Sequence, residues 1–182
     1  MSGGGVFLDR DGTLVHDPGY LHTPSAVTLL PGVADGLGHL AAAGWPLVIV
    51  SNQSGIARGL YGPDAFHAVN RRVEELLADR GVTFSAEYHC PHHPAFTGPC
   101  TCRKPATTLF RLAQEDVGLD LTRSWFVGNR LTDVQPAGAL GGHGILIAMT
   151  AREEDVAGAR AAGFEVVPDF LAAASLITAA PR

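Results

Sequence analysis

Short apolar runs alternate along this chain with segments of helical periodicity, and this alternation restricts the fold more than any other feature. A continuous apolar run such as Leu47–Val50 fits a strand that is buried on both faces. Similar runs lie at 6–8, 125–127, 145–147 and 165–167, with a weaker one at 86–89. The sequence predicts helices after Pro31-Gly32, at about 63–79 and 107–117, from near Thr132, at about 153–162 and from Asp169. The pattern predicts an α/β fold, in which a parallel sheet carries helices on both faces.

Length and composition favour one globular domain over residues 1–182. The chain has 182 residues, of which 46 % are apolar and 17 % charged, enough to bury a full core. The formal net charge is -5, and Arg71-Arg72 is the only adjacent arginine pair. A protein that binds nucleic acid would carry a basic stripe. We therefore expect no nucleic-acid partner.

No segment resembles a targeting or membrane-spanning sequence. Residues 1–5 lack a basic and apolar signal segment, and the longest strongly apolar stretch, 45–50, is too short to cross a bilayer. We expect a soluble cytoplasmic protein that has no membrane partner. A monomer is the working expectation for its oligomeric state.

Polar residues gather where the predicted strands end. The clusters are 9–13, 51–53, 103–104 and 129–133. In parallel sheets, functional sites form in the loops beyond the carboxyl ends of the strands. One crevice can therefore collect all four clusters.

Asp9 and Asp11 leave the first apolar run two residues apart, and Gly12 follows. A carboxylate at that place can attack phosphorus and form an aspartyl phosphate, while the second carboxyl protonates the leaving alkoxide and then deprotonates water. Two anions that face a phosphate need a counter-charge, and Mg²⁺ is a suitable hard cation. For Asp-x-Asp-Gly alone, an ordinary turn is the competing interpretation.

The second and third clusters supply groups that bind phosphoryl oxygens. Backbone N–H groups of Ser51, Asn52 and Gln53, together with the Ser51 hydroxyl, can donate hydrogen bonds to a phosphate. Lys104 offers a positive charge, and Arg103 offers a planar fork for a second phosphate or a carboxylate.

All three cysteines lie within a short loop that also contains histidine. Cys90, His92, Cys100 and Cys102 provide three thiolates and an imidazole, a closed tetrahedral zinc set. Such a site leaves no open position, so we expect the zinc to stabilise the loop. The neighbouring His93 is the alternative ligand, and three free thiols are the alternative to any metal.

Together these motifs resemble the haloacid dehalogenase (HAD) superfamily, and within it the branch of histidinol-phosphate and heptose bisphosphate phosphatases. The resemblance rests on segments 7–13, 51–59, 90–94 and 100–105 and covers about residues 6–148. It implies a Rossmann-like fold without a large cap domain.

The resemblance also implies a role for each matching position. Asp9 matches the nucleophile and a Mg²⁺ ligand, and Asp11 matches the general acid-base, whose backbone carbonyl also binds Mg²⁺. Cys90, His92, Cys100 and Cys102 match structural zinc ligands. The positions expected to bind phosphate or substrate are Arg10, Asp17, Gly19, Tyr20, Ser51, Asn52, Gln53, Ser54, Arg103, Lys104 and Arg130.

One position departs from the family pattern. The family usually has Gly-Asp where this chain has Gly128-Asn129, and that aspartate binds Mg²⁺. An asparagine can still offer a carbonyl oxygen but brings no charge, so Mg²⁺ affinity should fall. Asp133, four residues later, is a candidate to compensate.

The resemblance leaves several functions open. The first choice is hydrolysis of D-glycero-D-manno-heptose 1,7-bisphosphate, because 17–22 and 54–59 resemble the heptose enzymes. The short interval between His92 and Cys100 is closer to the histidinol-phosphate type, and other sugar phosphates are further alternatives. A second class of function, favoured by Asn129, is a catalytically silent domain that binds a phosphorylated ligand.

Overall fold

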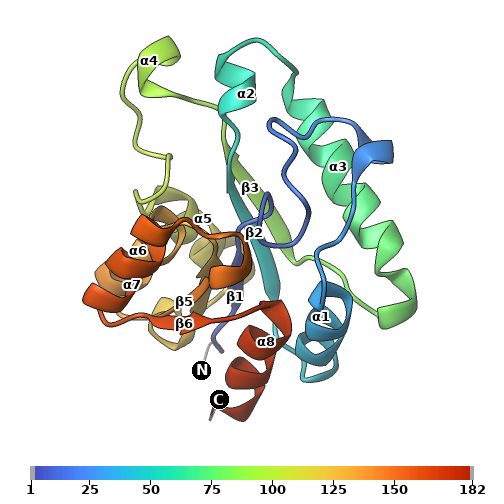
Figure 1. Cartoon of the computed structure of the whole chain (residues 1–182), viewed down its shortest axis with the longest axis vertical. Coiled ribbons are helices and arrows are strands. Elements are labelled where there is room, and N and C mark those ends of the chain that lie inside the picture. The colour runs from blue at the N-terminus through green and yellow to red at the C-terminus, as the bar shows by residue number, and fades with distance from the viewer. Residues whose placement is uncertain (1–2, 181–182) are drawn as a thin grey trace.

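One parallel sheet organises the molecule (Figure 1). The structure is a computed structural model that describes residues 3–180; residues 1–2, which belong to the segment considered above for a signal, and 181–182 lie outside the description. The six strands lie in the order β3-β2-β1-β4-β5-β6. They are β1 (Val6–Leu8), β2 (Leu47–Asn52), β3 (Ala86–Cys90), β4 (Trp125–Gly128), β5 (His143–Ile147) and β6 (Glu165–Val167). Every run that the sequence predicts as a strand is one.

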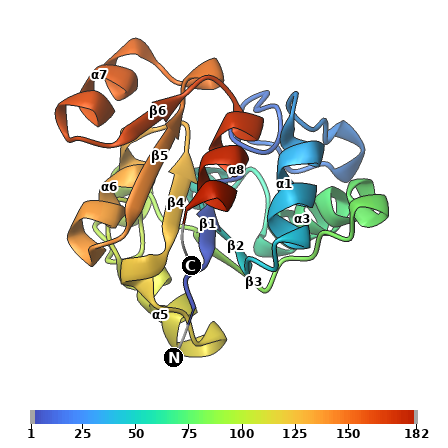
Figure 2. The ribbon, with the colours of Figure 1, turned by 90° about the horizontal axis from the view of Figure 1, so that it is seen from below.

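Helices cover both faces of this sheet, as Figure 2 shows. Helices α1 (Val33–Ala42), α3 (Pro63–Leu76) and α8 (Phe170–Ala179) pack on one face. The other face carries α5 (Thr108–Val117), α6 (Leu131–Leu140) and α7 (Glu153–Ala161). Successive side chains of a strand point to opposite faces, so Val6 and Leu8 belong to the first layer and Phe7 to the second. The predicted α/β class is confirmed.

The centre of the second layer is aromatic. The Phe7 ring centroid lies 5.0 Å from that of Phe126 and 5.3 Å from that of Phe110. All three side chains are buried. Phe7 stands two residues before Asp9, so this packing fixes the end of β1 from which the acidic cluster emerges.

The structure corrects the expected helices at their ends. The helix predicted to reach Asp79 ends at Leu76, and a 3₁₀ turn, Ala78–Arg80, follows it. Helical spacing predicts Leu76 inside with Val69 and Val73, but Leu76 is 38 % exposed, whereas Leu77 is buried. Two single-turn helices, α2 (Ser54–Ala57) and α4 (Pro94–Thr97), are too short to give a periodic signal. Further 3₁₀ turns lie at Pro24–Ala26, Leu121–Arg123 and Ala148–Thr150.

Within residues 3–180, no cap domain is inserted into the fold. All strands of residues 3–180 belong to the one sheet. The connection between β1 and α1, residues 9–32, holds only one 3₁₀ turn and two isolated bridges. Within the described residues, no helix is both long and apolar enough to cross a lipid bilayer.

Replacing Phe7 by alanine should lower the free energy of unfolding by about 3–5 kcal/mol, because it removes a buried ring and leaves a cavity in the aromatic cluster. Urea denaturation measures this difference. Leu112→Ala on α5 is the control, since Leu112 is 42 % exposed and its loss should cost little. Equal losses in the two variants would show that the cluster does not anchor β1.

Candidate active site

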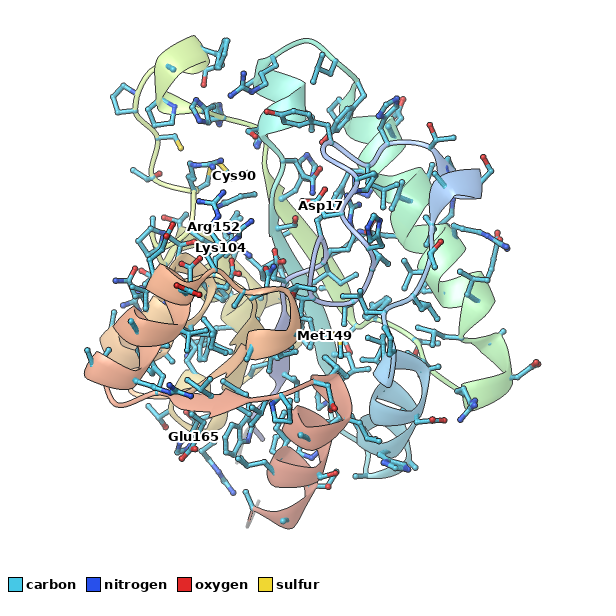
Figure 3. The ribbon with its side chains drawn as sticks, viewed as in Figure 1. Asp17, Cys90, Lys104, Met149, Arg152 and Glu165 are labelled. Atoms are coloured by element: carbon cyan, nitrogen blue, oxygen red, sulfur yellow. The ribbon has the colours of Figure 1, made fainter. Side chains whose placement is uncertain are left out.

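The four polar clusters meet in one cavity of about 450 Å³ beyond the carboxyl ends of β1, β2 and β4. Lys104 and Asp17 lie at this end of the sheet, on opposite sides of its central strands (Figure 3). The residues that line the cavity are Asp9, Asp11, Asp17, Ser51, Asn52, Ser54, Arg103, Asn129, Arg130, Thr132, Asp133, Arg152, Glu154 and Asp155. The predicted convergence is therefore present.

Asp9 is held by a buried cation. Lys104 Nζ lies 2.8 Å from Asp9 Oδ1 and 2.8 Å from Asp133 Oδ1, and it donates to the carbonyl oxygen of Val50. Thr13 Oγ1 donates to Asp9 Oδ2. Burial alone would lower the pKa of Lys104, but the charges of Asp133 and Asp9 outweigh it and raise that pKa. Lys104 is therefore a fixed positive charge beside the carboxylate.

Asp11 is bound on two sides. Arg10 Nε donates to Asp11 Oδ1 at 3.0 Å, and Arg10 Nη2 donates to Oδ2 at 2.9 Å. Gln53 Nε2 also donates to Oδ2, at 2.7 Å. Burial raises the pKa of Asp11 above its ordinary value, although the charge and hydrogen bonds of Arg10 oppose the rise. A raised pKa suits a carboxyl that must deliver a proton.

Ser51 faces the cavity, and Gln53 lies behind it. Gln53 Nε2 donates to Ser51 Oγ at 2.7 Å, which leaves the Ser51 hydroxyl hydrogen available for a phosphoryl oxygen. Gln53 itself is only 2 % exposed. The side-chain oxygen of Gln53, Oε1, accepts a hydrogen bond from the Tyr61 hydroxyl at 2.7 Å. The Gln53 side chain therefore orients Ser51 and Asp11 and is not part of the cavity wall.

Asn52 and Arg103 attach the loop after the cysteines to the sheet. Asn52 and Lys104 exchange two hydrogen bonds, Asn52 Nδ2 to the Lys104 carbonyl and the Lys104 N–H to Asn52 Oδ1. Arg103 lines the cavity, and its Nη1 donates to the carbonyl oxygen of His92. The expected substrate-facing arginine is thus connected to the cysteine loop.

The Arg10 side chain points away from the cavity. It is fully buried, and its guanidinium group contacts Asp11, Phe66, Asn70 and Leu21. Arg10 is not among the residues that line the cavity, so the structure does not bring its side chain to the predicted substrate site. Its side chain acts on Asp11 instead.

The loop that contains Asp17, Gly19 and Tyr20 borders a second hollow of about 320 Å³, which shares Asp11, Asp17, Asn52 and Ser54 with the first. Asp17 Oδ1 accepts a hydrogen bond from Gly19 N. Tyr20 adopts a left-handed backbone with φ of 58°, and Arg58 lies over its ring at 5.5 Å. The predicted substrate loop thus lies at the mouth of the cavity.

Arg130 and Asp133 lie at the start of α6. Arg130 Nη1 is 3.5 Å from Asp155 Oδ2 on the cavity wall. Asp133 Oδ2 accepts a hydrogen bond from Arg130 N, and Oδ1 contacts Lys104. Both oxygens of Asp133 are therefore engaged by the protein, and direct compensation for Asn129 would compete with these contacts.

Asn129 offers an oxygen suited to a cation. Its side chain is 3 % exposed, and its Nδ2 donates to the Thr150 carbonyl oxygen at 3.4 Å. Its Oδ1 is buried and has no hydrogen-bond partner among the described residues. A buried oxygen without a donor is costly unless it binds an ion or water. Asn129 and Asp9 line the same cavity, and amide and carboxylate oxygens are ligands that Mg²⁺ prefers.

The cysteine loop forms a compact set of ligand atoms. Those of Cys90, His92, Cys100 and Cys102 all lie within 4.8 Å of one another. His93 is not part of this group, and its Nδ1 accepts a hydrogen bond from Ala95 N at the start of α4. The arrangement is able to hold a metal ion, and it selects His92 over His93.

Comparison with known proteins agrees with this geometry. A family model described as HAD-hydrolase-like matches residues 101–173. The chain is 41 % identical over 137 residues to the D-glycero-beta-D-manno-heptose-1,7-bisphosphate 7-phosphatase of Photorhabdus laumondii, covering 72 % of this chain and 73 % of that protein. It is 42 % identical over 151 residues to the corresponding enzyme of Thermosynechococcus vestitus, covering 78 % and 77 %. The chain belongs to the HAD superfamily, in the heptose bisphosphate phosphatase branch.

Solved structures of HAD phosphatases share the fold of this chain. A D,D-heptose 1,7-bisphosphate phosphatase from B. bronchiseptica, complexed with magnesium and phosphate, matches with a TM-score of 0.85 and 30 % identity, covering 96 % of this chain and 97 % of that one. A HAD-like phosphatase from Mesorhizobium loti matches with a TM-score of 0.80 and 34 % identity, covering 100 % and 90 %. The chain is a HAD-type phosphoric monoester hydrolase.

Sequence reasoning missed several residues of this HAD site. Tyr61 binds Gln53, and Asn70 binds Arg10. Neither stands in a motif or at a strand end, so no local signal marks it. Thr150, which donates to the Gly12 carbonyl and accepts from Asn129, is likewise brought in only by the fold.

Replacing Asn129 by aspartate should lower the Mg²⁺ concentration for half-maximal activity by on the order of tenfold, because a ligand oxygen gains a negative charge. A Mg²⁺ titration of phosphate release measures it. Glu154→Gln, which removes a carboxylate from another part of the cavity wall, should change little. An unchanged Mg²⁺ requirement in Asn129→Asp would remove position 129 from the metal site.

Proposed function

We propose that this chain is a Mg²⁺-dependent phosphatase that removes one phosphate from a small sugar bisphosphate through an aspartyl phosphate on Asp9. The observation that carries the proposal is a carboxylate with a fixed cation, Lys104, and a hydroxyl donor, Ser51, at one cavity. D-glycero-D-manno-heptose 1,7-bisphosphate is the first substrate choice, because relatives about 40 % identical carry that name.

The first step transfers the phosphoryl group to the protein. An oxygen of the Asp9 carboxylate attacks phosphorus and forms a new O–P bond, while the bond from phosphorus to the ester oxygen breaks. Asp11 gives its proton to that oxygen, and the sugar leaves with a neutral hydroxyl at that position and its other phosphate intact. Lys104 and Ser51 offset the charge on the phosphoryl oxygens.

The second step returns the protein to its starting state. Asp11, now a carboxylate, takes a proton from a water molecule as that water attacks phosphorus. The bond between phosphorus and Asp9 breaks, and inorganic phosphate leaves. The sum is hydrolysis of one phosphate ester, with Asp9 and Asp11 regenerated.

Magnesium fits the oxygen donors at the centre of this site. Asp9, the backbone carbonyl of Asp11 and Asn129 Oδ1 would hold it, and the unsatisfied Oδ1 supports that assignment. When bound, the ion supplies positive charge that offsets the two carboxylates and the phosphate.

Two arginines suit a substrate with a second anionic group. Arg103 and Arg130 both line the cavity and come from different loops. A planar guanidinium binds phosphate through paired hydrogen bonds, so these side chains favour a bisphosphate over a monophosphate. Histidinol phosphate and other sugar phosphates remain the alternatives to be tested.

A screen of phosphate release tests the substrate assignment. Purified protein with Mg²⁺ should release phosphate faster from the heptose bisphosphate than from histidinol phosphate or hexose phosphates. Asp9→Asn should abolish turnover on every compound, because an amide cannot act as the nucleophile, while the fold stays intact. Asp64→Asn, at an exposed site on α3, is the matched control.

Two outcomes would contradict the proposal. Activity of Asp9→Asn near the unaltered rate would exclude Asp9 as nucleophile. Absence of phosphate release from all compounds by the unaltered protein, with Mg²⁺ present, would favour the silent phospho-ligand-binding domain.

Zinc is our assignment for the cysteine loop, since three thiolates and an imidazole form a closed tetrahedral set. Purified protein should contain about one zinc per chain, and removing a ligand with Cys100→Ser should lower Tm by at least about 5 °C. Elemental analysis and thermal melting measure these effects. Thr97→Ser in the same loop is the control, and a Cys100→Ser variant with unchanged zinc content and Tm would contradict the assignment.

A further inference from the structure

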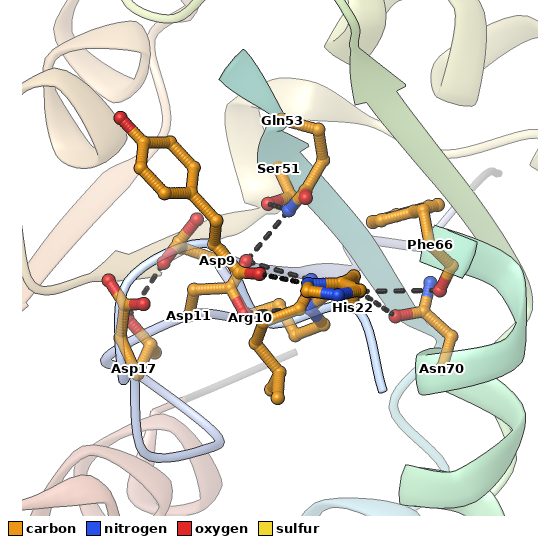
Figure 4. A network of polar contacts seen from close by, with 12 residues as sticks. Asp9, Arg10, Asp11, Asp17, His22, Ser51, Gln53, Phe66 and Asn70 are labelled. Carbon is orange, nitrogen blue, oxygen red and sulfur yellow. Dashed lines mark hydrogen bonds and ion pairs between the residues drawn. The ribbon is translucent and has the colours of Figure 1, made fainter. Parts of the chain in front are cut away.

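Arg10 lies between the proposed acid, Asp11, and helix α3 (Figure 4). One edge of its guanidinium binds both Asp11 oxygens. The other edge, Nη1, donates to Asn70 Oδ1 at 3.1 Å and to the Phe66 carbonyl oxygen at 3.3 Å. The Phe66 ring lies 4.8 Å below the guanidinium carbon. A long side chain is thereby held at both ends inside the protein.

The contacts continue beyond Asn70 to strand β3. Asn70 is 2 % exposed, and its Nδ2 donates to Glu87 Oε2. The other Glu87 oxygen pairs with His67 Nδ1. The series from Asp11 to His67 thus joins the β1 loop, α3 and β3 through side chains that are buried or partly buried.

Glu87 determines which way the Asn70 amide points. An amide carries an acceptor on one side and donors on the other. Arg10 requires the acceptor, so the Asn70 NH₂ group must face an acceptor of its own, and Glu87 provides it. Without Glu87, the reversed amide would set two donors against each other beside a buried cation.

We propose that Asn70 and Glu87 are positioning residues for the reaction, which act through Arg10 to hold the Asp11 carboxyl where it protonates the leaving oxygen. Neither residue lines the cavity. The inference rests on the proposed function, because it takes Asp11 as the acid. It predicts that these residues affect one chemical step and not the stability of the fold alone.

The chemistry of the leaving group separates a role in positioning Asp11 from a role in the stability of the fold. The heptose 7-phosphate is an ester of a primary alcohol, whose alkoxide leaves only with help from an acid. The phenolate of p-nitrophenyl phosphate is stable without a proton. The ratio of kcat/KM for the two substrates therefore reports how well Asp11 delivers its proton, since kcat/KM covers the steps up to departure of the leaving group.

Asn70→Leu is the first variant, because leucine has a similar size but neither binds Arg10 nor reaches Glu87 by a hydrogen bond. The ratio of kcat/KM for heptose bisphosphate to that for p-nitrophenyl phosphate should fall by about tenfold or more. Asp11→Asn sets the full effect of losing the acid. Val73→Ala is the matched control, since Val73 is buried on the same helix outside the series; it should lower Tm and leave the ratio unchanged.

Exchanging the carboxylate and the amide between positions 70 and 87 tests whether the ratio can be restored. This second test remains valid if Asn70→Leu does not fold. Asn70→Asp alone sets a second carboxylate against Glu87 and should lower the ratio. Adding Glu87→Gln restores a donor facing an acceptor and returns the total charge to its original value. The double variant should recover most of the lost ratio.

The results divide cleanly between the proposals. If the Asn70 variants lower kcat/KM equally for the two substrates, so that the ratio stays constant as in Val73→Ala, Asn70 and Glu87 serve only the fold. The same conclusion follows if the double variant does not recover the ratio. If Asp11→Asn itself leaves the ratio unchanged while the unaltered enzyme is active, the acid assignment in the proposed function is wrong and the positioning role falls with it.

Discussion

A single buried cation connects the separate parts of this site. Lys104 has a side chain that is 1 % exposed, and it contacts Asp9 at the end of β1 and Asp133 in the first turn of α6. A charge so placed is stable only because two carboxylates face it. The pair Lys104–Asp9 spans 95 positions in sequence. The site therefore depends on how accurately the loop before Lys104 is anchored.

The cysteine loop provides that anchor. Cys102 stands two residues before Lys104, and Asn52 at the end of β2 holds the Lys104 backbone by two hydrogen bonds. A metal ion on the four ligands would fix a segment that has no strand or long helix of its own. The cysteine loop and Asp9, the proposed nucleophile, are thus connected through Lys104, whose backbone follows the loop and whose side chain contacts Asp9.

Motif residues could be predicted from the sequence because the information is local. Apolar runs end just before Asp9 and Ser51, and polar side chains at strand ends converge in any parallel sheet. The direction of the Arg10 side chain could not be predicted, because it depends on α3 packing beside the β1 loop. The contacts of Asn70 and Tyr61 could not be predicted for the same reason. The end of α3 at Leu76 shows a related limit, since a change from α to 3₁₀ geometry leaves no mark in the pattern of apolar residues.

The two carboxyls proposed for catalysis occupy different surroundings. Asp9 Oδ1 lies 2.8 Å from Lys104 Nζ, and Thr13 Oγ1 donates to Asp9 Oδ2, so this carboxyl is held in place at the cavity. Asp11 meets a cation too, yet burial dominates and raises its pKa, which favours a carboxyl that holds a proton. The charge and hydrogen bonds of Arg10 oppose that rise but do not cancel it. Its bidentate contact, fixed from behind by Asn70, is better explained as control of direction, because a proton is transferred efficiently only along a well-placed hydrogen bond.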